Sequence, residues 1–128
     1  MSLIYNMNNI YLFVYGTMKK GFTNHGRLDM TKFLGSAITV EKYAMYSNAE
    51  NTFPCVIKND KKYNIKGELY QIYFQDQIDD IDRFEGVPKH YKREEINIKI
   101  VGSDELIKAY IYFYQLEDYD NRKVLSRW

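Results

Sequence analysis

The sequence predicts an α+β fold in which a small, mixed, barrel-like β-sheet packs with one or two short helices. Tyrosine contributes 13 of the 128 residues, and aromatic side chains favour the half-buried surface of a sheet. Several short apolar segments follow one another closely, as the strands of a small sheet do. Only one segment has clear helical spacing, so helices are expected to be few.

The first predicted strand covers residues 10–15, which are continuously apolar or aromatic. Such a run predicts a strand that is buried on both faces. Residues 16–26 contain three glycines, a composition typical of a structured loop. A short helix is expected after the loop, at residues 27–33.

Three more strands are predicted at residues 37–46, 53–58 and 65–74, with a polar turn at residues 47–52.

The clearest helix is predicted at residues 76–85, where Ile78, Ile81 and Phe84 recur at helical spacing. Gly86 follows this segment and is expected to end the helix. Asp76 is the expected N-cap residue.

A β-hairpin is predicted from strands at residues 94–100 and 106–116. In the second strand, tyrosines at 110, 112 and 114 alternate with apolar residues at 109, 111 and 113, so we expect both faces to be covered. The polar residues 117–128 are interpreted as a tail. The whole chain, 1–128, is expected to form a single domain.

The charge of the chain is nearly balanced, with 18 basic and 17 acidic residues and a net charge of +1. This balance argues against nucleic acid or an anionic membrane as a partner and favours a small molecule. The single cysteine, Cys55, excludes an internal disulfide and favours the reducing cytoplasm. No secretory signal or membrane-spanning segment is expected. The oligomeric state is left open.

Glu85 is the acidic residue of the predicted helix that shares an arc with Ile78 and Ile81 on a helical wheel. The helix C-terminus and partial burial both disfavour a carboxylate, so both would raise the pKa of Glu85 toward the range of a general base. Alternatively, Glu85 turns to solvent at a frayed helix end or pairs with one of the basic residues Lys89, Lys92 or Arg93. The wheel alone leaves both interpretations open.

The loop after the first strand, beginning Gly16-Thr17-Met18, offers backbone N–H groups that could hold an anion. Phe22 and Thr23 stand where a nucleotide-binding P-loop requires lysine and a hydroxyl residue, so that function is disfavoured. An ordinary glycine-rich turn remains the alternative.

Two motifs resemble those of the gamma-glutamylcyclotransferase-like superfamily. Residues 14–21, with Asn24 and His25, resemble its Y-G-[ST]-L-x-x-G-x-x-N-H opening, and residues 81–93 resemble its L-D-x-[FLY]-E-G-x-x-x-x-Y-x-R segment. The short chain is most similar to the gamma-glutamylamine cyclotransferase (AIG2-like) branch. Met18 departs from the usual leucine, which leaves the substrate range open.

The resemblance implies an enzyme that cyclises a gamma-glutamyl group to 5-oxoproline and releases an amine, without a metal or cofactor. Glu85 would be the general acid and base. The substrate-binding residues would be Tyr15, Gly16, Thr17, Met18 and Tyr91.

Two other functions stay open at this point. A protein with this fold could bind a small molecule or regulate a partner without turnover. The many tyrosines could also form a platform for single-stranded nucleic acid, although the net charge of +1 argues against it.

Overall fold

The computed structural model describes residues 7–48, 52–115 and 119–128. These residues form, in chain order, β1 (Met7–Val14), the 3-10 helix η1 (His25–Leu28), β2 (Lys32–Asn48), β3 (Pro54–Ile57), β4 (Tyr63–Phe74), α2 (Gln75–Glu85), β5 (Tyr91–Ile100), β6 (Leu106–Tyr114) and β7 (Tyr119–Leu125). Within them, no helix has the length and apolar character needed to cross a membrane.

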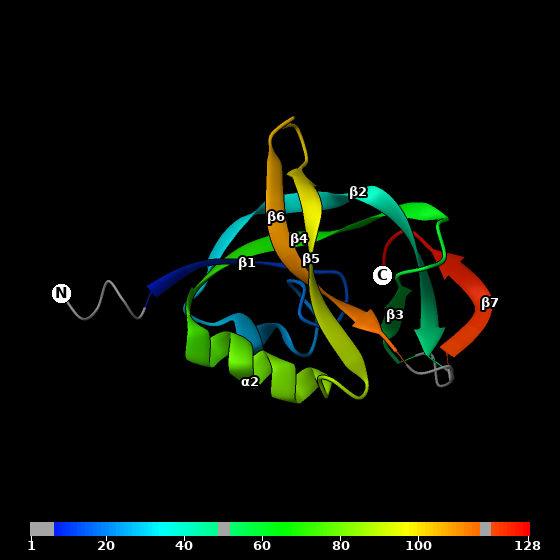
Figure 1. Ribbon diagram of the computed structural model, residues 1–128, viewed down its shortest axis with the longest axis horizontal. Helices are drawn as coiled ribbons and strands as arrows, with labels where there is room; N and C mark the ends of the chain where they lie inside the picture. Colours follow the sequence, from blue (N-terminus) through cyan, green and yellow to red (C-terminus); the bar gives the residue numbers. More distant parts are fainter. Residues whose placement is uncertain (1–6, 49–51, 116–118) are drawn as a thin grey trace.

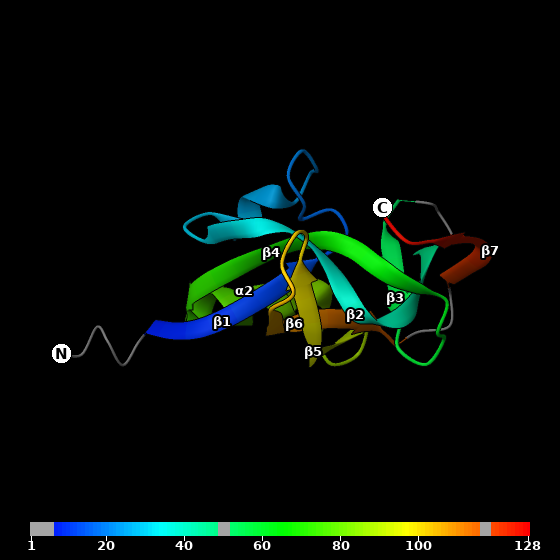
Figure 2. The same ribbon diagram turned by 90° about the horizontal axis from the view of Figure 1, so that it is seen from above.

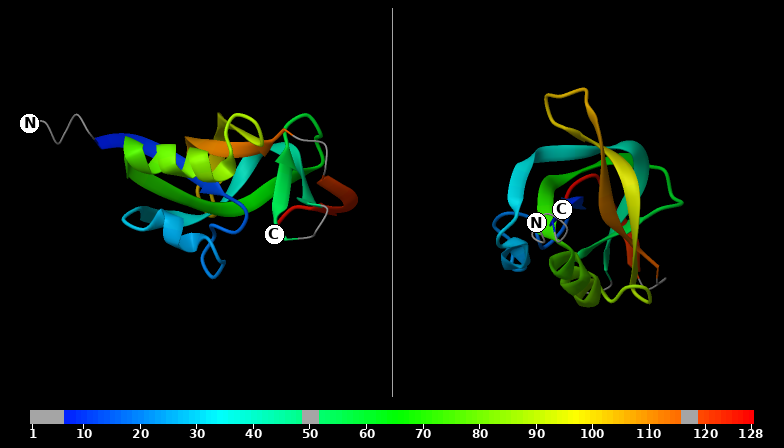
Figure 3. Two further views of the ribbon diagram at one scale, coloured as in Figure 1. Left: turned by 90° about the horizontal axis from the view of Figure 1, so that it is seen from below. Right: turned by 60° about the vertical axis from the view of Figure 1, so that its left-hand side comes forward.

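Five strands close into a mixed barrel in the order β2-β4-β1-β6-β5, with β5 returning to pair with β2 (Figure 1). The pair β1–β6 is parallel, and the other pairs of this ring are antiparallel. The second half of β2 leaves the barrel and pairs with β3 and β7. One helix, α2, lies outside the barrel beside β1, as Figure 2 and the right-hand view of Figure 3 show. The predicted α+β, barrel-like fold is therefore confirmed.

Two apolar clusters lie on opposite faces of β1 and β6. On β1, Leu12 and Val14 belong to the cluster under α2, whereas Phe13 belongs to the cluster inside the barrel. On β6, Tyr112 and Tyr114 face the first cluster, and the alternating residues Ala109, Ile111 and Phe113 face the second. The expectation that both faces of this strand are covered is confirmed.

Helix α2 is fixed to the barrel by its buried residues Ile78 and Ile81, which are 0% and 1% exposed. Burial of each side chain contributes about 1.5–3 kcal/mol relative to exposure. This packing aims the C-terminal end of α2 at the loop that follows β1.

Two predictions near the helices were wrong. The segment predicted as a helix at 27–33 forms only the short helix η1, and β2 already begins at Lys32. Met30 adopts a left-handed conformation with φ of 64°, and Phe33 pairs with Tyr70 in the sheet. Asp76 is not the N-cap: Phe74 occupies that position directly after β4, without a side-chain cap, and Asp76 lies in the first turn.

The interpretation of residues 117–128 as a tail was also wrong, because this segment contains β7. Its backbone pairs with β2, for example Leu125 with Met45, and the backbone N–H of Lys66 donates to the carbonyl of Ser126 at 2.8 Å. The edge of β2 to which β7 pairs exists only once the protein has folded, so the sequence of residues 117–128 alone does not indicate the strand.

Candidate active site

A cavity of about 600 Å³ opens between the loop after β1, the start of β3, the C-terminal end of α2 and the strands β5 and β6. All six residues predicted for the site line it, namely Tyr15, Gly16, Thr17, Met18, Glu85 and Tyr91. The wall also contains Phe13, Val14, Thr23, Asn24, Thr52, Phe53, Pro54, Phe84, Gly86, His90, Tyr112 and Tyr114. Glu85 is the acidic residue among them.

Glu85 is the last residue of α2, and the next residue, Gly86, turns the chain with φ of 70°. A side chain at position 86 would meet the ring of His90, since a Cβ there would lie 2.5 Å from His90 Cδ2. Glycine therefore permits both the left-handed turn and the close return of the chain. This tight ending supports the partly buried position of Glu85 at the cavity wall.

The buried arc of α2 is narrower than the helical wheel predicts. Phe84, placed on that arc by its spacing, is 37% exposed and lines the cavity. The guanidinium of Arg27 lies 3.6 Å from the centre of its ring. The end of α2 is thus covered by the segment around η1 instead of by the barrel core.

Burial is the main influence on the carboxyl group of Glu85, and it raises the pKa to about 7. The nearby positive charge of Arg27 opposes this shift, and the negative charge of Asp82 adds to it. The proposed ion pair with a following basic residue is not formed in the described part of the chain. Lys92 pairs with Glu94 at 3.7 Å, and Arg93 pairs with Asp82 at 3.4 Å.

The loop after β1 is braced by the side chains of Asn24 and His25. Asn24 Nδ2 donates to Thr17 Oγ1 at 2.9 Å, and its backbone N–H donates to the carbonyl of Thr17 at 2.9 Å. The Nδ1 atom of His25 lies 2.9 Å from the carbonyl oxygen of Met18. The described hydrogen bonds of the loop do not use the N–H groups of Gly16, Thr17 and Met18 as donors.

Gly16 allows the loop and β3 to approach closely. A Cβ at this position would lie 2.9 Å from Cγ of Pro54, a distance at which one of the two segments must move. A residue with a side chain would therefore alter the cavity wall.

The hydroxyl groups of three buried tyrosines are held around the cavity. Tyr15 donates to the carbonyl of Tyr112 at 2.7 Å, and Tyr91 donates to the carbonyl of Pro54 at 3.3 Å. Burial raises the pKa of Tyr15, Tyr91 and Tyr112 well above the usual range, so all three stay protonated at neutral pH. They serve as neutral hydrogen-bond donors.

Tyr112 and Pro54 belong to the site but were not predicted from the sequence. The alternation of β6 placed Tyr112 on a covered face, but nothing in the spacing showed that this face borders a cavity. Among the described residues, no group of three histidine, cysteine or acidic side chains is placed to hold a metal ion.

The sequence is similar to a family model and to named proteins. The family model described as gamma-glutamyl cyclotransferase, AIG2-like, matches residues 12–128. A protein of Methanocaldococcus jannaschii, provisionally named a gamma-glutamylcyclotransferase, is 43% identical over 105 residues, which cover 81% of this chain and 83% of the relative. Gamma-glutamylaminecyclotransferase A of Danio rerio is 33% identical over 110 residues, covering 80% of this chain and 68% of its own.

The fold is similar to that of solved structures. The crystal structure of an AIG2-like protein from Mus musculus superposes with a TM-score of 0.82 and covers 96% of this chain and 88% of its own. At 22% identity, that match shows a shared fold. The family match over nearly the whole chain and the two sequence relatives establish more: the chain belongs to the gamma-glutamyl cyclotransferase, AIG2-like family of enzymes.

Proposed function

We propose that this protein is a gamma-glutamylamine cyclotransferase, which converts a gamma-glutamyl amine to 5-oxoproline and a free amine. The observation that carries the proposal is that Glu85, with a pKa of about 7, lines the same cavity as the loop Gly16-Thr17-Met18. A carboxyl group with this pKa can take and return a proton near neutral pH.

The reaction is an intramolecular acyl transfer. The α-amino nitrogen of the gamma-glutamyl group forms a bond to its own gamma-carbonyl carbon, and the bond from that carbon to the leaving nitrogen breaks. Starting from the neutral amine, the attacking nitrogen loses one proton as the ring closes, and the leaving nitrogen gains one. Glu85 accepts the first proton and donates it in the second step, so the proton count balances.

The loop is assigned to anion binding. Its N–H groups at Gly16, Thr17 and Met18 would hold the α-carboxylate of the substrate or the oxyanion formed during attack. Because the nucleophile belongs to the substrate, a large part of the acceleration comes from holding the chain of the glutamyl group in a bent conformation. Tyr15 and Tyr91, held in place by hydrogen bonds to carbonyl groups, shape the wall against which that conformation packs.

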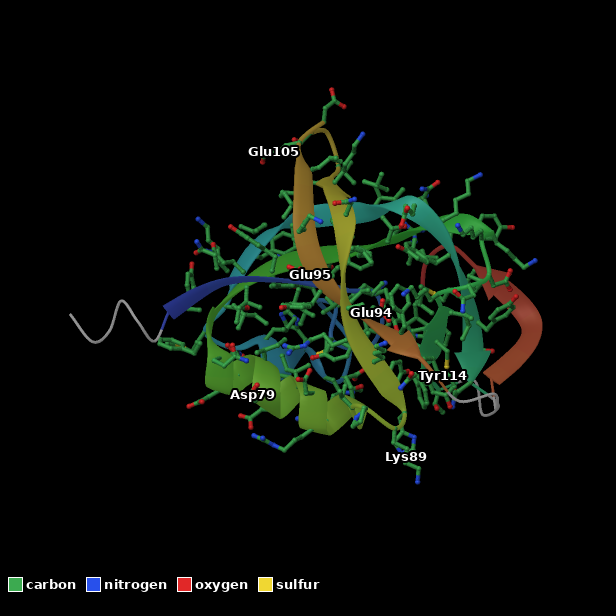
Figure 4. The ribbon with its side chains drawn as sticks, in the orientation of Figure 1. Asp79, Lys89, Glu94, Glu95, Glu105 and Tyr114 are labelled. Carbon is green, nitrogen blue, oxygen red and sulfur yellow. The ribbon has the colours of Figure 1, made fainter. Side chains whose placement is uncertain are left out.

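Mass-spectrometric detection of 5-oxoproline tests the proposal. The purified protein is incubated with a panel of gamma-glutamyl amines and gamma-glutamyl peptides, beside a Glu85→Gln variant. Glu95→Gln is the matched control, because Glu95 is exposed on β5 and is not part of the cavity wall. Figure 4 labels Glu95 on the hairpin formed by β5 and β6.

Turnover by the wild type and by Glu95→Gln, together with a loss of at least about 100-fold in Glu85→Gln, supports both the reaction and the base. Equal turnover by all three proteins overturns the role of Glu85. No turnover by a folded wild type that still binds the panel overturns the enzymatic proposal and favours a binding protein with this fold.

A further inference from the structure

We propose that Asp82 is a positioning residue for Glu85: with Tyr112 and Arg93 it fixes the last turn of α2 against the hairpin β5–β6. The inference rests on the proposed function and assigns a role to residues outside the acid and base step itself. Asp82 precedes Glu85 by three residues, which places the two side chains on neighbouring positions of the same helix face.

Asp82 is held by two partners from different strands. The hydroxyl of Tyr112 on β6 donates to Asp82 Oδ1 at 2.7 Å. The Nε atom of Arg93 on β5 lies 3.4 Å from the same oxygen. The side chains of Asp82 and Arg93 are 22% and 21% exposed, and Arg93 is further fixed by the ring of Tyr110, 4.5 Å away.

A surface pair on the same helix provides the contrast. Asp80 pairs with Arg83, but their side chains are 67% and 72% exposed and both belong to α2. Such a pair links two turns of one helix and contributes little to its placement. The Asp82 contacts instead connect the helix to two strands, and charge-assisted hydrogen bonds in a partly buried setting are stronger and more directional.

Tyr112 extends this connection across the cavity. Its backbone carbonyl accepts a hydrogen bond from the hydroxyl of Tyr15, and its own hydroxyl donates a hydrogen bond to Asp82. Tyr15 immediately precedes the Gly16 loop. One residue of β6 therefore holds both the end of the helix that carries the base and the start of the loop assigned to the substrate.

The charged and titratable groups around Glu85 come from several elements. They are Asp82 on α2, Arg27 on η1, Tyr15 after β1, His90 in the turn before β5, Tyr91 on β5 and Tyr112 on β6. Cys55 on β3 acts on Tyr15 and Tyr91, and Arg93 on β5 acts on Tyr112 and pairs with Asp82. Of these, Arg27 and Asp82 influence the Glu85 carboxyl directly, with opposite signs. Removing the charge of Asp82 makes the carboxylate of Glu85 easier to form.

Three variants distinguish the effect of the hydrogen bond between Asp82 and Tyr112 from the effect of the negative charge of Asp82. Asp82→Asn keeps an oxygen that can accept from Tyr112 but removes the charge. Asp82→Ala removes both, and Tyr112→Phe removes the hydrogen bond while keeping the ring and the carbonyl that binds Tyr15. Asp80→Asn is the control, since it removes a carboxylate from the exposed face of the same helix. Thermal unfolding establishes that each variant is folded.

The kinetic parameters are measured from pH 5 to 9 with the substrate found for the wild type. We expect kcat to fall about 10-fold to 100-fold in Asp82→Ala and Tyr112→Phe while KM stays within about 2-fold, because a misplaced base slows the chemical step and leaves binding intact. In Asp82→Asn, the increase of kcat/KM with pH occurs at lower pH than in the wild type. The pH profile of Asp80→Asn coincides with that of the wild type. A rise in KM at unchanged kcat, or kcat values of Asp82→Ala and Tyr112→Phe that match those of Asp80→Asn, overturns the inference.

A titration that needs no turnover keeps this inference distinct from the proposed function. The side-chain carboxyl carbon of Glu85 is followed by NMR in the wild type and in Asp82→Asn, with the resonance assigned through Glu85→Gln. A lower midpoint in Asp82→Asn supports an interaction between Asp82 and Glu85. This result holds even if the wild type shows no turnover, because absent turnover would count against the proposed reaction alone. Identical midpoints in the two proteins would show that Asp82 does not influence the carboxyl group of Glu85.

Discussion

The hydroxyl group of Tyr15 donates a 2.7 Å hydrogen bond to the backbone carbonyl of Tyr112, 97 positions away in the sequence. This bond connects the end of β1 to β6, the parallel neighbours whose pairing helps to close the barrel. Tyr15 is 7% exposed and Tyr112 is 2% exposed, so little water can replace the bond. A long-range contact of this kind fixes the two walls of the cavity relative to each other.

Removal of the Tyr15 hydroxyl should therefore destabilise the protein. We expect Tyr15→Phe to lower the free energy of unfolding by about 1–3 kcal/mol, because the carbonyl of Tyr112 stays buried and loses its donor. Urea unfolding measures the change. Tyr11→Phe is the matched control, since Tyr11 lies on β1, the strand that Tyr15 follows, and its hydroxyl has no hydrogen bond to the described residues. Equal effects of the two substitutions would show that the bond to Tyr112 contributes nothing specific.

Gly16 in the loop after β1 and Gly26 in η1 should respond differently to alanine. A Cβ at Gly16 would lie 2.9 Å from Pro54 Cγ, whereas a Cβ at Gly26 meets nothing within 4 Å. We expect Gly16→Ala to cost about 1–3 kcal/mol of stability through overpacking and to weaken substrate binding, because the cavity wall must shift. Gly26→Ala should leave both unchanged. Melting temperatures and KM values for the pair test this, and a Gly16→Ala protein that matches the wild type in both would contradict it.

The strands and the main helix of this fold are predictable because their patterns are local. The apolar run of β1, the alternation of β6 and the spacing of Ile78 and Ile81 each depend on residues close together in the sequence. Gly86 marked the end of α2 for the same reason, because only a residue without a side chain fits its left-handed turn beside His90.

The features that were not predictable depend on contacts between distant segments. The strand β7 exists because β2 extends beyond the barrel and offers an edge, which no pattern in residues 117–128 reveals. Phe84 follows the helical spacing of a core residue but is covered by Arg27 from another segment. Tyr112 became a site residue only when β6 was placed beside β1, and its bond to Asp82 required the position of α2.

Asn24 should control the order of the substrate loop. Its side chain and its backbone both donate to Thr17, at 2.9 Å in each case. We expect Asn24→Ala to speed amide hydrogen exchange in residues 17–25, because the side-chain brace is lost and the loop opens more often. If the loop binds the substrate, KM should rise by about 3-fold to 10-fold, which corresponds to one lost hydrogen bond of about 1 kcal/mol. Asn97→Ala, on β5 and outside the cavity wall, is the control. Unchanged exchange in the loop would contradict the bracing role.

Glu85 should lower the stability of the protein at the pH at which it acts. Its pKa is raised from 4.5 to about 7 by burial, so between these values the folded state holds a proton that the unfolded state has lost. Folding is then favoured at low pH and loses stability as the pH rises from 4.5 through 7, with a cost on the order of 3 kcal/mol above that range.

Glu85→Gln removes this titration while keeping the size of the side chain. The variant should match the wild type near pH 4.5 and exceed its free energy of unfolding at pH 8. Urea unfolding across this range provides the measurement, with Glu95→Gln as the exposed control that should show no such trend. A stability difference between Glu85→Gln and the wild type that stays constant with pH would mean that the carboxyl of Glu85 titrates alike in the folded and unfolded states. In that case burial at the end of α2 would not prepare it for proton transfer near neutral pH, and the group that exchanges protons with the substrate would have to be sought elsewhere on the cavity wall.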